Sequence, residues 1–315
     1  MTPARADAAL IEALERSHIH PLWDRYKRIT PVAPKAKDAP MHWRWRELEP
    51  FAERAAREVG IEDVERRALI LANPAFGGET ITTQNLIGAF TVLEPGDRAL
   101  PHRHTAAAIR FATRAEGAVT IVNGRRCDMR EGDLVLTPPM CWHGHINQGA
   151  RRTVWFDAAN MPAIASLDAS FFEPGARQDE RFWEVGAEGS SEYRFAGEDM
   201  RRQLGQASAG PDGARTVRYT KNDGSVMPTL DLFLKRIESR TKTARATYSA
   251  ICLVVSGEGR STIGEQRFEW SRHDVFTIPH WSWASHEARS ASADLFIVTD
   301  RALYERLDLL REEIR

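Results

Sequence analysis

The sequence contains few cysteines, no long apolar run and almost no net charge. Its three cysteines, Cys127, Cys141 and Cys252, lack CxxC spacing, which indicates reduced thiols and a cytoplasmic protein. The strongly apolar runs, such as 250–255, are much shorter than the roughly 18 residues needed to cross a membrane. The N-terminal residues have no apolar core typical of a signal peptide. With 43 Lys+Arg against 44 Asp+Glu and no basic block, neither nucleic acid nor membrane is expected as a partner.

What the chain does have is enough apolar material and length for two domains. Hydrophobic residues make up 42% of its 315 residues, and a domain averages roughly 150 residues. Residues 1–67 are interpreted as an N-terminal arm, with predicted helices over 6–17 and over 50–64, the second starting at a proline. We expect Trp43 and Trp45 to anchor this arm on the core.

Short apolar or alternating runs, separated by turn signals, dominate the rest of the chain. An Asn-Gly pair at 123–124 between two such runs is a strong hairpin signal. The spacing predicts a β-barrel or sandwich over 68–160 and another within 216–315. Residues 161–215 are more polar and are interpreted as a linker with some helix. The last stretch, 301–315, predicts an amphipathic C-terminal helix.

The two β-rich regions align with each other as an internal repeat. The block that begins at Asp133 matches the block that begins at Asp274, and similar matches run through most of both regions. A duplicated barrel is therefore predicted. Three histidines of the first copy are alanines in the second: His102, His104 and His143 align with Ala244, Ala246 and Ala284. Because the three are lost together, we expect them to form one metal site, present in the first barrel only.

The histidines have the spacing of a metal site on strands. His102 and His104 are two residues apart, so on a strand both imidazoles point to the same face. The blocks Gly96-x5-His102-x-His104 and Gly132-x5-Pro138-x4-His143-x3-Asn147 resemble the two signatures of the cupin family. The alternative is two surface histidines and one core histidine. Imidazole ligands suit Zn, Cu, Fe and Ni, so ligand type does not identify the metal.

The run from His102 to Phe111, with Trp142-His143-x-His145-x-Asn147 downstream, resembles the gentisate and salicylate 1,2-dioxygenases over most of the chain. This resemblance implies an all-β bicupin, two jelly-roll barrels with an N-terminal helical arm and a C-terminal helix. It also implies a homotetramer. The implied reaction uses Fe(2+) and O2 to open the ring of a small aromatic acid, a 2-hydroxybenzoate, between C1 and C2.

Carried over to this chain, the resemblance makes His102, His104 and His143 the iron ligands. Arg110 and His145 would be catalytic and would contact the substrate, and Thr91 and Asp157 would line the substrate site. A buried guanidinium complements a carboxylate, which supports Arg110. The alternatives are a strand-end salt bridge for Arg110, a core hydrogen bond for His145 and a loop cap for Asp157.

Several positions depart from the family pattern. Gly144 and Ile146 replace an Asp and a Gly beside His145, Thr91 replaces a glutamine, and Asn160 replaces an aspartate. These changes favour a 5-nitro- or 5-halosalicylate as a competitor of gentisate for the natural substrate. Two other functions stay open at this point: another metal-cupin enzyme, and a bicupin that binds a small molecule without catalysis.

Overall fold

The computed structural model describes residues 8–175, 180–184, 191–221 and 224–315. The chain divides into two compact units, residues 1–35 and 36–315. The first contains two short helices, α1 (Ala8–Arg16) and α2 (Leu22–Ile29). Among the described residues, no helix has both the length and the apolar character to cross a membrane.

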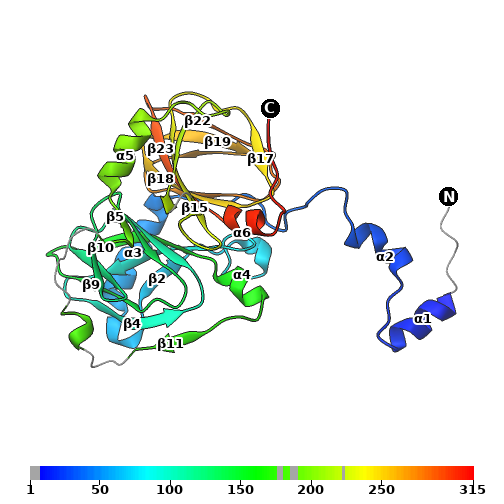
Figure 1. Ribbon diagram of the computed structural model, residues 1–315, viewed down its shortest axis with the longest axis horizontal. Coiled ribbons are helices and arrows are strands. Elements are labelled where there is room, and N and C mark those ends of the chain that lie inside the picture. Colours follow the sequence, from blue (N-terminus) through cyan, green and yellow to red (C-terminus); the bar gives the residue numbers. More distant parts are fainter. Residues whose placement is uncertain (1–7, 176–179, 185–190, 222–223) are drawn as a thin grey trace. The chain divides into compact units, whose positions relative to one another are not determined.

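The second unit is built from two antiparallel β-sandwiches (Figure 1). The first sandwich has an inner sheet of order β12-β8-β5-β10-β3-β2 and an outer sheet of order β11-β4-β9-β6-β7. Its strands are β2 (Arg67–Ile70), β3 (Ile87–Leu93), β4 (Arg98–His104), β5 (Ala108–Arg114), β6 (Ala118–Val122), β7 (Arg125–Asp128), β8 (Leu134–Thr137), β9 (His143–Asn147), β10 (Thr153–Ala159), β11 (Phe172–Pro174) and β12 (Arg194–Phe195).

The second sandwich repeats this plan, with an inner sheet β1-β21-β18-β23-β16-β13 and an outer sheet β20-β19-β22-β17-β24. Its strands are β1 (His42–Trp43), β13 (Arg215–Arg218), β16 (Asp231–Ile237), β17 (Ala244–Ala246), β18 (Ala250–Ser256), β19 (Gly259–Ile263), β20 (Gln266–Trp270), β21 (Val275–Ile278), β22 (Ala284–Ala288), β23 (Ala293–Thr299) and β24 (Glu312–Ile314). A separate two-stranded sheet pairs β14 (Thr220–Lys221) with β15 (Gly224–Ser225) in antiparallel orientation. The predicted all-β bicupin is confirmed.

The helices of the second unit are short. They are α3 (Trp45–Glu58), α4 (Met161–Ser166), α5 (Gly197–Gln206) and α6 (Arg301–Arg306), with 3-10 turns η1 (Ile61–Asp63), η2 (Pro74–Phe76) and η3 (Glu180–Phe182). Of these, α3 and α5 pack on the apolar core of the inner sheets. The predicted Asn-Gly hairpin joins β6 to β7. Both turn residues, Asn123 and Gly124, have positive φ, 46° and 73°, which suits the right-handed twist of the strands.

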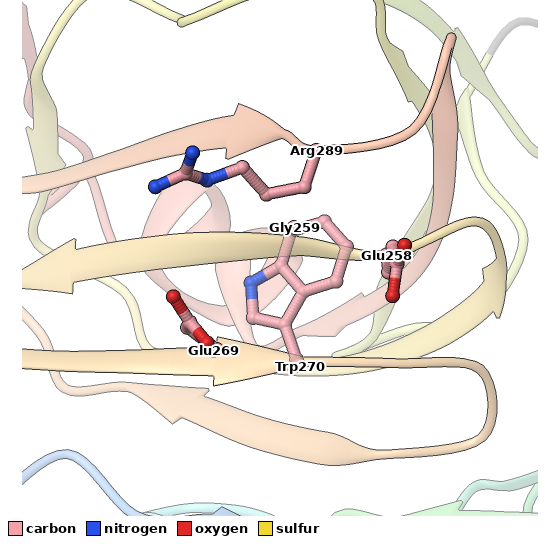
Figure 2. Close-up of a pocket in the computed structure, with 5 residues that line it drawn as sticks. All are labelled: Glu258, Gly259, Glu269, Trp270 and Arg289. Atoms are coloured by element: carbon pink, nitrogen blue, oxygen red, sulfur yellow. The ribbon is translucent and has the colours of Figure 1, made fainter.

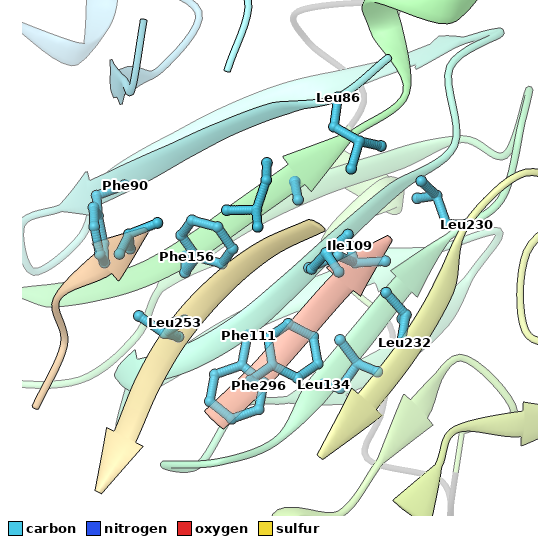
Figure 3. Packing of buried hydrophobic residues seen from close by; sticks show 14 of the residues in the cluster. Leu86, Phe90, Ile109, Phe111, Leu134, Phe156, Leu230, Leu232, Leu253 and Phe296 are labelled. Carbon is cyan, nitrogen blue, oxygen red and sulfur yellow. The ribbon is translucent and has the colours of Figure 1, made fainter. Parts of the chain in front are cut away.

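One apolar core joins the two inner sheets. It contains residues of both sandwiches, and Figure 3 shows them interleaved between the sheets. Phe111 of β5 stacks on Phe296 of β23 with ring centroids 4.2 Å apart. Trp45 is buried against this core and Trp43 packs on it, as the sequence predicts. Central strands of the inner sheets, such as β3 and β23, are therefore buried on both faces, and their sequences are mostly apolar.

The repeat extends beyond the barrels. Asp133, at the start of β8, accepts a hydrogen bond at 2.8 Å from the N–H of Gly197, the first residue of α5. Asp274, at the start of β21, accepts one at 2.8 Å from the N–H of Trp45, the first residue of α3. In each sandwich, an aspartate thus fixes the start of a helix and the short strand before it.

Three local expectations differ from the structure. The helix predicted over 50–64 begins at Trp45 and ends at Glu58, because the distant Asp274 carboxylate holds its first N–H. Within 161–215, β11 and β12 belong to the sheets of the first sandwich rather than to a free linker.

The third difference is at the C-terminal end. The helix predicted over 301–315 ends at Arg306, and Asp308 has a positive φ of 57° that turns the chain. The following β24 pairs with β17, and this pairing supplies the backbone hydrogen bonds that a longer helix would have made.

Candidate metal centre and active site

The three predicted ligand histidines meet inside the first sandwich. His102 and His104 lie on β4, His143 lies on the neighbouring β9, and His102 pairs directly with His143 across the two strands. One ligand atom from each of the three lies within 4.8 Å of the others. The ring centroids of His102 and His143 are 4.3 Å apart, and those of His104 and His143 are 4.9 Å apart. Strand register therefore brings together three imidazoles that are 41 residues apart at most in the chain.

Backbone carbonyls fix the tautomer of all three rings. The Nδ1 of His102 bonds to the oxygen of Leu100 at 2.8 Å, and His104 and His143 make the same kind of bond to Ala106 and Cys141. A carbonyl only accepts, so each Nδ1 carries the proton and each Nε2 keeps its lone pair. The Nε2 atoms of His102 and His143 are buried without any hydrogen-bond partner.

Burial keeps these imidazoles neutral. Burial, helped by the positive charges of Arg66 and Arg110, lowers the pKa of His102 to about 3 and that of His104 to about 4. The pKa of His143 is also well below its ordinary value, first because of burial. Neutral imidazoles with converging, unpaired lone pairs fit a divalent transition-metal ion. The three imidazoles therefore fit a metal ion.

Arg110 enters the same interior from the opposite sheet. It lies on β5, its side chain is fully buried, and its Nη1 donates to the hydroxyl of Thr137. Its Nε lies 3.6 Å from the Asp157 carboxylate, too far for a hydrogen bond, and both Nε and Nη2 lack partners. Burial lowers the pKa of Arg110 to about 10, so the group stays charged at neutral pH. It is a buried cation with free donors.

Asp157 lies in the middle of β10, so the loop-cap alternative is wrong. It accepts hydrogen bonds from the hydroxyl of Thr91 and, at 3.0 Å, from the indole of Trp155. Burial raises the pKa of its carboxyl, although Arg110 opposes the shift. Thr91 is completely buried, and its hydroxyl proton is directed to Asp157. The structure thus places Thr91 beside Asp157 as part of the polar set around Arg110.

His145 is buried on β9, two residues after His143. Its Nδ1 lies 2.8 Å from the hydroxyl of Thr120, and its Nε2 has no partner. Burial holds its pKa well below the ordinary value, and Arg110 adds to the shift. Its ring centroid is 5.8 Å from that of His143. All the predicted site residues therefore gather in the interior of one sandwich.

Two neighbours of the site, Arg66 and Phe172, were not predicted from the sequence. The charge of Arg66 acts on His102, His104 and Asp157, and no ion pair to its guanidinium is present among the described residues. The adjacent Arg67, in contrast, is paired with Asp97. The two arginines were visible as a pair in the sequence, but only the strand geometry distinguishes them. Phe172 of β11 stacks on His102, with centroids 5.4 Å apart.

The second sandwich lacks this centre, although it keeps the register. Ala244 pairs with Ala284 at the place where His102 pairs with His143. A cavity of about 370 Å³ lies at this sandwich and is lined by Glu258, Gly259, Glu269, Trp270 and Arg289 (Figure 2). None of the predicted site residues lines it. The histidine-to-alanine changes therefore remove the ligands and leave the strands in place.

Fold and site together define a bicupin with three histidines placed to hold a metal ion in one of its barrels. Residues 89–159 match the cupin domain family. A 5-aminosalicylate 1,2-dioxygenase from a Comamonas species is 32% identical, over 97% of this chain and 89% of that protein. A gentisate 1,2-dioxygenase from Aquipseudomonas alcaligenes is 29% identical, over 95% of this chain and 94% of that protein.

Solved structures give the same result. A salicylate 1,2-dioxygenase from Pseudoaminobacter salicylatoxidans, studied with gentisate, superposes with a TM-score of 0.90 at 29% identity, covering all of this chain and 96% of that chain. The chain belongs to the gentisate and salicylate 1,2-dioxygenase family of oxidoreductases. The resemblance predicted from the histidine motifs is confirmed.

Proposed function

We propose that the protein is an Fe(II)-dependent dioxygenase that inserts both atoms of O2 between C1 and C2 of a 2-hydroxybenzoate. One observation carries this proposal. Three neutral imidazoles present their lone pairs inside a barrel whose other wall presents a buried guanidinium with unpaired donors. A metal ion and an organic anion are the two ligands that such a pair of features recognises.

His102, His104 and His143 would hold the metal, each oriented by the carbonyl that its Nδ1 contacts. Iron(II) at this position would supply Lewis acidity toward a phenolate and the electrons that activate O2. The three ligands carry no charge, so an anionic substrate is attracted by the full charge of the ion. We assign no carboxylate ligand to the site.

Arg110 would bind the substrate carboxylate through Nε and Nη2, the two nitrogen atoms that lack partners. Thr137 holds Nη1 and Asp157 lies beside Nε, so the guanidinium plane is oriented before substrate arrives. Arg66 would add a second positive charge at the site. Burial excludes water from Arg110, which strengthens its attraction for a carboxylate.

The ring substituent is the finer part of the proposal. A 5-substituted salicylate, with a nitro, halo or hydroxyl group, is our preferred substrate class. Thr91 is shorter than the glutamine that the family pattern has here, and its proton is already donated to Asp157. The site therefore offers more space and less amide hydrogen bonding near this wall than the family pattern, which favours bulky substituents that need no hydrogen bond, such as nitro or halo groups, over the hydroxyl of gentisate.

The test is anaerobic loading with Fe(II), followed by oxygen-electrode assays with salicylate, gentisate and the 5-nitro, 5-chloro and 5-amino salicylates. We expect O2 uptake in equal amount to the substrate consumed, with new near-ultraviolet absorbance from a ring-opened acid. His104→Ala is the matched control and should abolish both signals. Substrate binding at full iron occupancy without O2 uptake, across the whole panel, would refute the proposal and identify a non-catalytic binding protein.

We also propose a homotetramer in the cytoplasm. The helix α2 exposes apolar side chains that a second copy could cover, including Leu22, Trp23 and Ile29, each more than half exposed. The three cysteines are unpaired, which suits a reducing compartment. Light scattering coupled to gel filtration tests the tetramer, and a monomeric mass at micromolar concentration would refute it.

A further inference from the structure

A short hydrogen-bonded chain runs behind His145. Thr120 of β6 pairs in register with His145 of β9, and its hydroxyl lies 2.8 Å from the Nδ1 of that imidazole. The sulfur of Met129 lies 3.4 Å from the same hydroxyl oxygen and can accept its hydrogen bond. All three side chains are buried, with at most 2% of each residue exposed. Water therefore does not compete for these bonds.

Two proton arrangements are compatible with these distances, and electrostatics separates them. If the Thr120 hydroxyl donated to Nδ1, the proton of the neutral imidazole would lie on Nε2. That N–H would be a buried donor without an acceptor, and it would face a region made positive by Arg110 and Arg66. If Thr120 donates to Met129 instead, Nδ1–H donates to Thr120 and the bare Nε2 faces the positive region. The second arrangement pairs both protons and turns a lone pair toward the cations.

We propose that Thr120 and Met129 are positioning residues that hold the proton of His145 on Nδ1 and present an unprotonated Nε2 to the substrate. The inference rests on the proposed function and adds which partner donates the hydrogen bond between the substrate and His145. A bare Nε2 accepts a hydrogen bond and cannot donate one, so it recognises the hydroxyl of an incoming 2-hydroxybenzoate, before that oxygen becomes a phenolate, and not its carboxylate. Arg110, which only donates, takes the carboxylate. The pair therefore fixes which way round the substrate binds.

The second sandwich contains the same chain with the opposite polarity. Its residues at the equivalent positions are Ser261, His286 and Trp270, in place of Thr120, His145 and Met129. The Trp270 indole N–H donates to the Ser261 hydroxyl at 2.9 Å, and that hydroxyl lies 2.7 Å from the Nδ1 of His286. An indole only donates, so among the described residues Nδ1 is the acceptor in contact with the Ser261 hydroxyl; this contact directs the serine proton to Nδ1 and places the imidazole proton on Nε2. The barrel with the metal ligands has an acceptor, methionine, where its copy has a donor.

The first test reads the tautomer directly and needs neither metal nor substrate. Full-length, metal-free protein with ¹⁵N-labelled histidine is examined by NMR, and the His145 ring signals are assigned by their absence in His145→Gln. We expect Nδ1 to be protonated and Nε2 to be bare. Thr120→Val removes the acceptor and should shift the proton to Nε2 in a measurable fraction of molecules, whereas Thr120→Ser keeps the wild-type pattern. A protonated Nε2 in the wild type, or no change in Thr120→Val, would overturn the proposal.

The second test uses the iron-loaded enzyme and its best substrate. Thr120→Val should lower kcat/KM by about 10- to 100-fold, the usual effect of removing a partner that orients a functional imidazole, and Thr120→Ser should restore most of it. Ser261→Ala is the matched control, because it breaks the equivalent bond in the sandwich without the ligands and should leave kcat/KM unchanged. Equal losses in Thr120→Val and Ser261→Ala would show a purely structural effect and overturn the proposal. Because the NMR result does not depend on turnover, failure of the proposed reaction would be distinguishable from failure of this inference.

Discussion

Replacing Arg110 by lysine keeps the positive charge and removes the fork of donors. In the structure, Nε and Nη2 are free and lie on one edge of the guanidinium, so a carboxylate can accept two parallel hydrogen bonds there. A lysine ammonium in the same space can supply one. A hydrogen bond to a charged group contributes about 1.5–3 kcal/mol, so Arg110→Lys should weaken substrate binding by about 10- to 150-fold.

The assay is calorimetric titration of salicylate into the iron-loaded, anaerobic protein, followed by kcat/KM under air. Iron content and Tm are measured in parallel, because a loss of metal would mimic a loss of substrate binding. Arg114→Lys is the matched control: it lies on the same strand, and its side chain is half exposed and paired with Glu49. An affinity of Arg110→Lys within threefold of wild type, with full iron content, would refute the assignment of Arg110 to the carboxylate.

Two further predictions concern stability. Burial raises the pKa of Asp300 to about 6 from an ordinary value of 3.8, so the folded state favours the protonated carboxyl. This preference stabilises the folded protein by about 3 kcal/mol. The stabilisation is complete below about pH 4 and is lost as the pH rises through 6. Asp300→Asn introduces the amide that occupies the equivalent position 160 in the first sandwich. The free energy of unfolding, measured with urea, should then fall less between about pH 4.5 and about pH 7.5 than in the wild type. Identical pH slopes of this free energy in both proteins would contradict the prediction. Addition of Fe(II) to the metal-free protein should raise Tm, because a ligand at a thousand times its Kd stabilises the folded state by about 4 kcal/mol. The increase should vanish in His104→Ala, and an equal increase in that variant would place the metal elsewhere.

The sequence was most informative where strand geometry alone sets the chemistry. The two-residue spacing of His102 and His104 is enough to place both rings on one face, and the repeat shows which histidines act together. The hairpin at 123–124 was likewise readable, since it depends on the backbone preferences of two adjacent residues.

Features that depend on distant partners were not readable. The start of α3 is set by Asp274, more than 200 residues away, and the C-terminal segment becomes a strand because β17 offers it a free edge. The same reason hid the roles of Arg66 and Thr120. Nothing in either residue's neighbours in the sequence indicates that the charge of Arg66 acts on His102 or that the Thr120 hydroxyl contacts an imidazole across a strand pair.

The shared core between the inner sheets has a consequence for how the sandwich without ligands can change. Phe296, Leu253 and their neighbours, together with residues of α3 and α5, cover the apolar back of the sandwich that has the three histidines. Deleting the second sandwich would expose that face to water and make the remainder prone to aggregation. The front of the second sandwich, its outer sheet β20-β19-β22-β17-β24, does not belong to this core cluster. Substitutions are therefore expected to accumulate freely at its front and to be rejected at its back, so a barrel with no metal ligands is still indispensable to the one that has them.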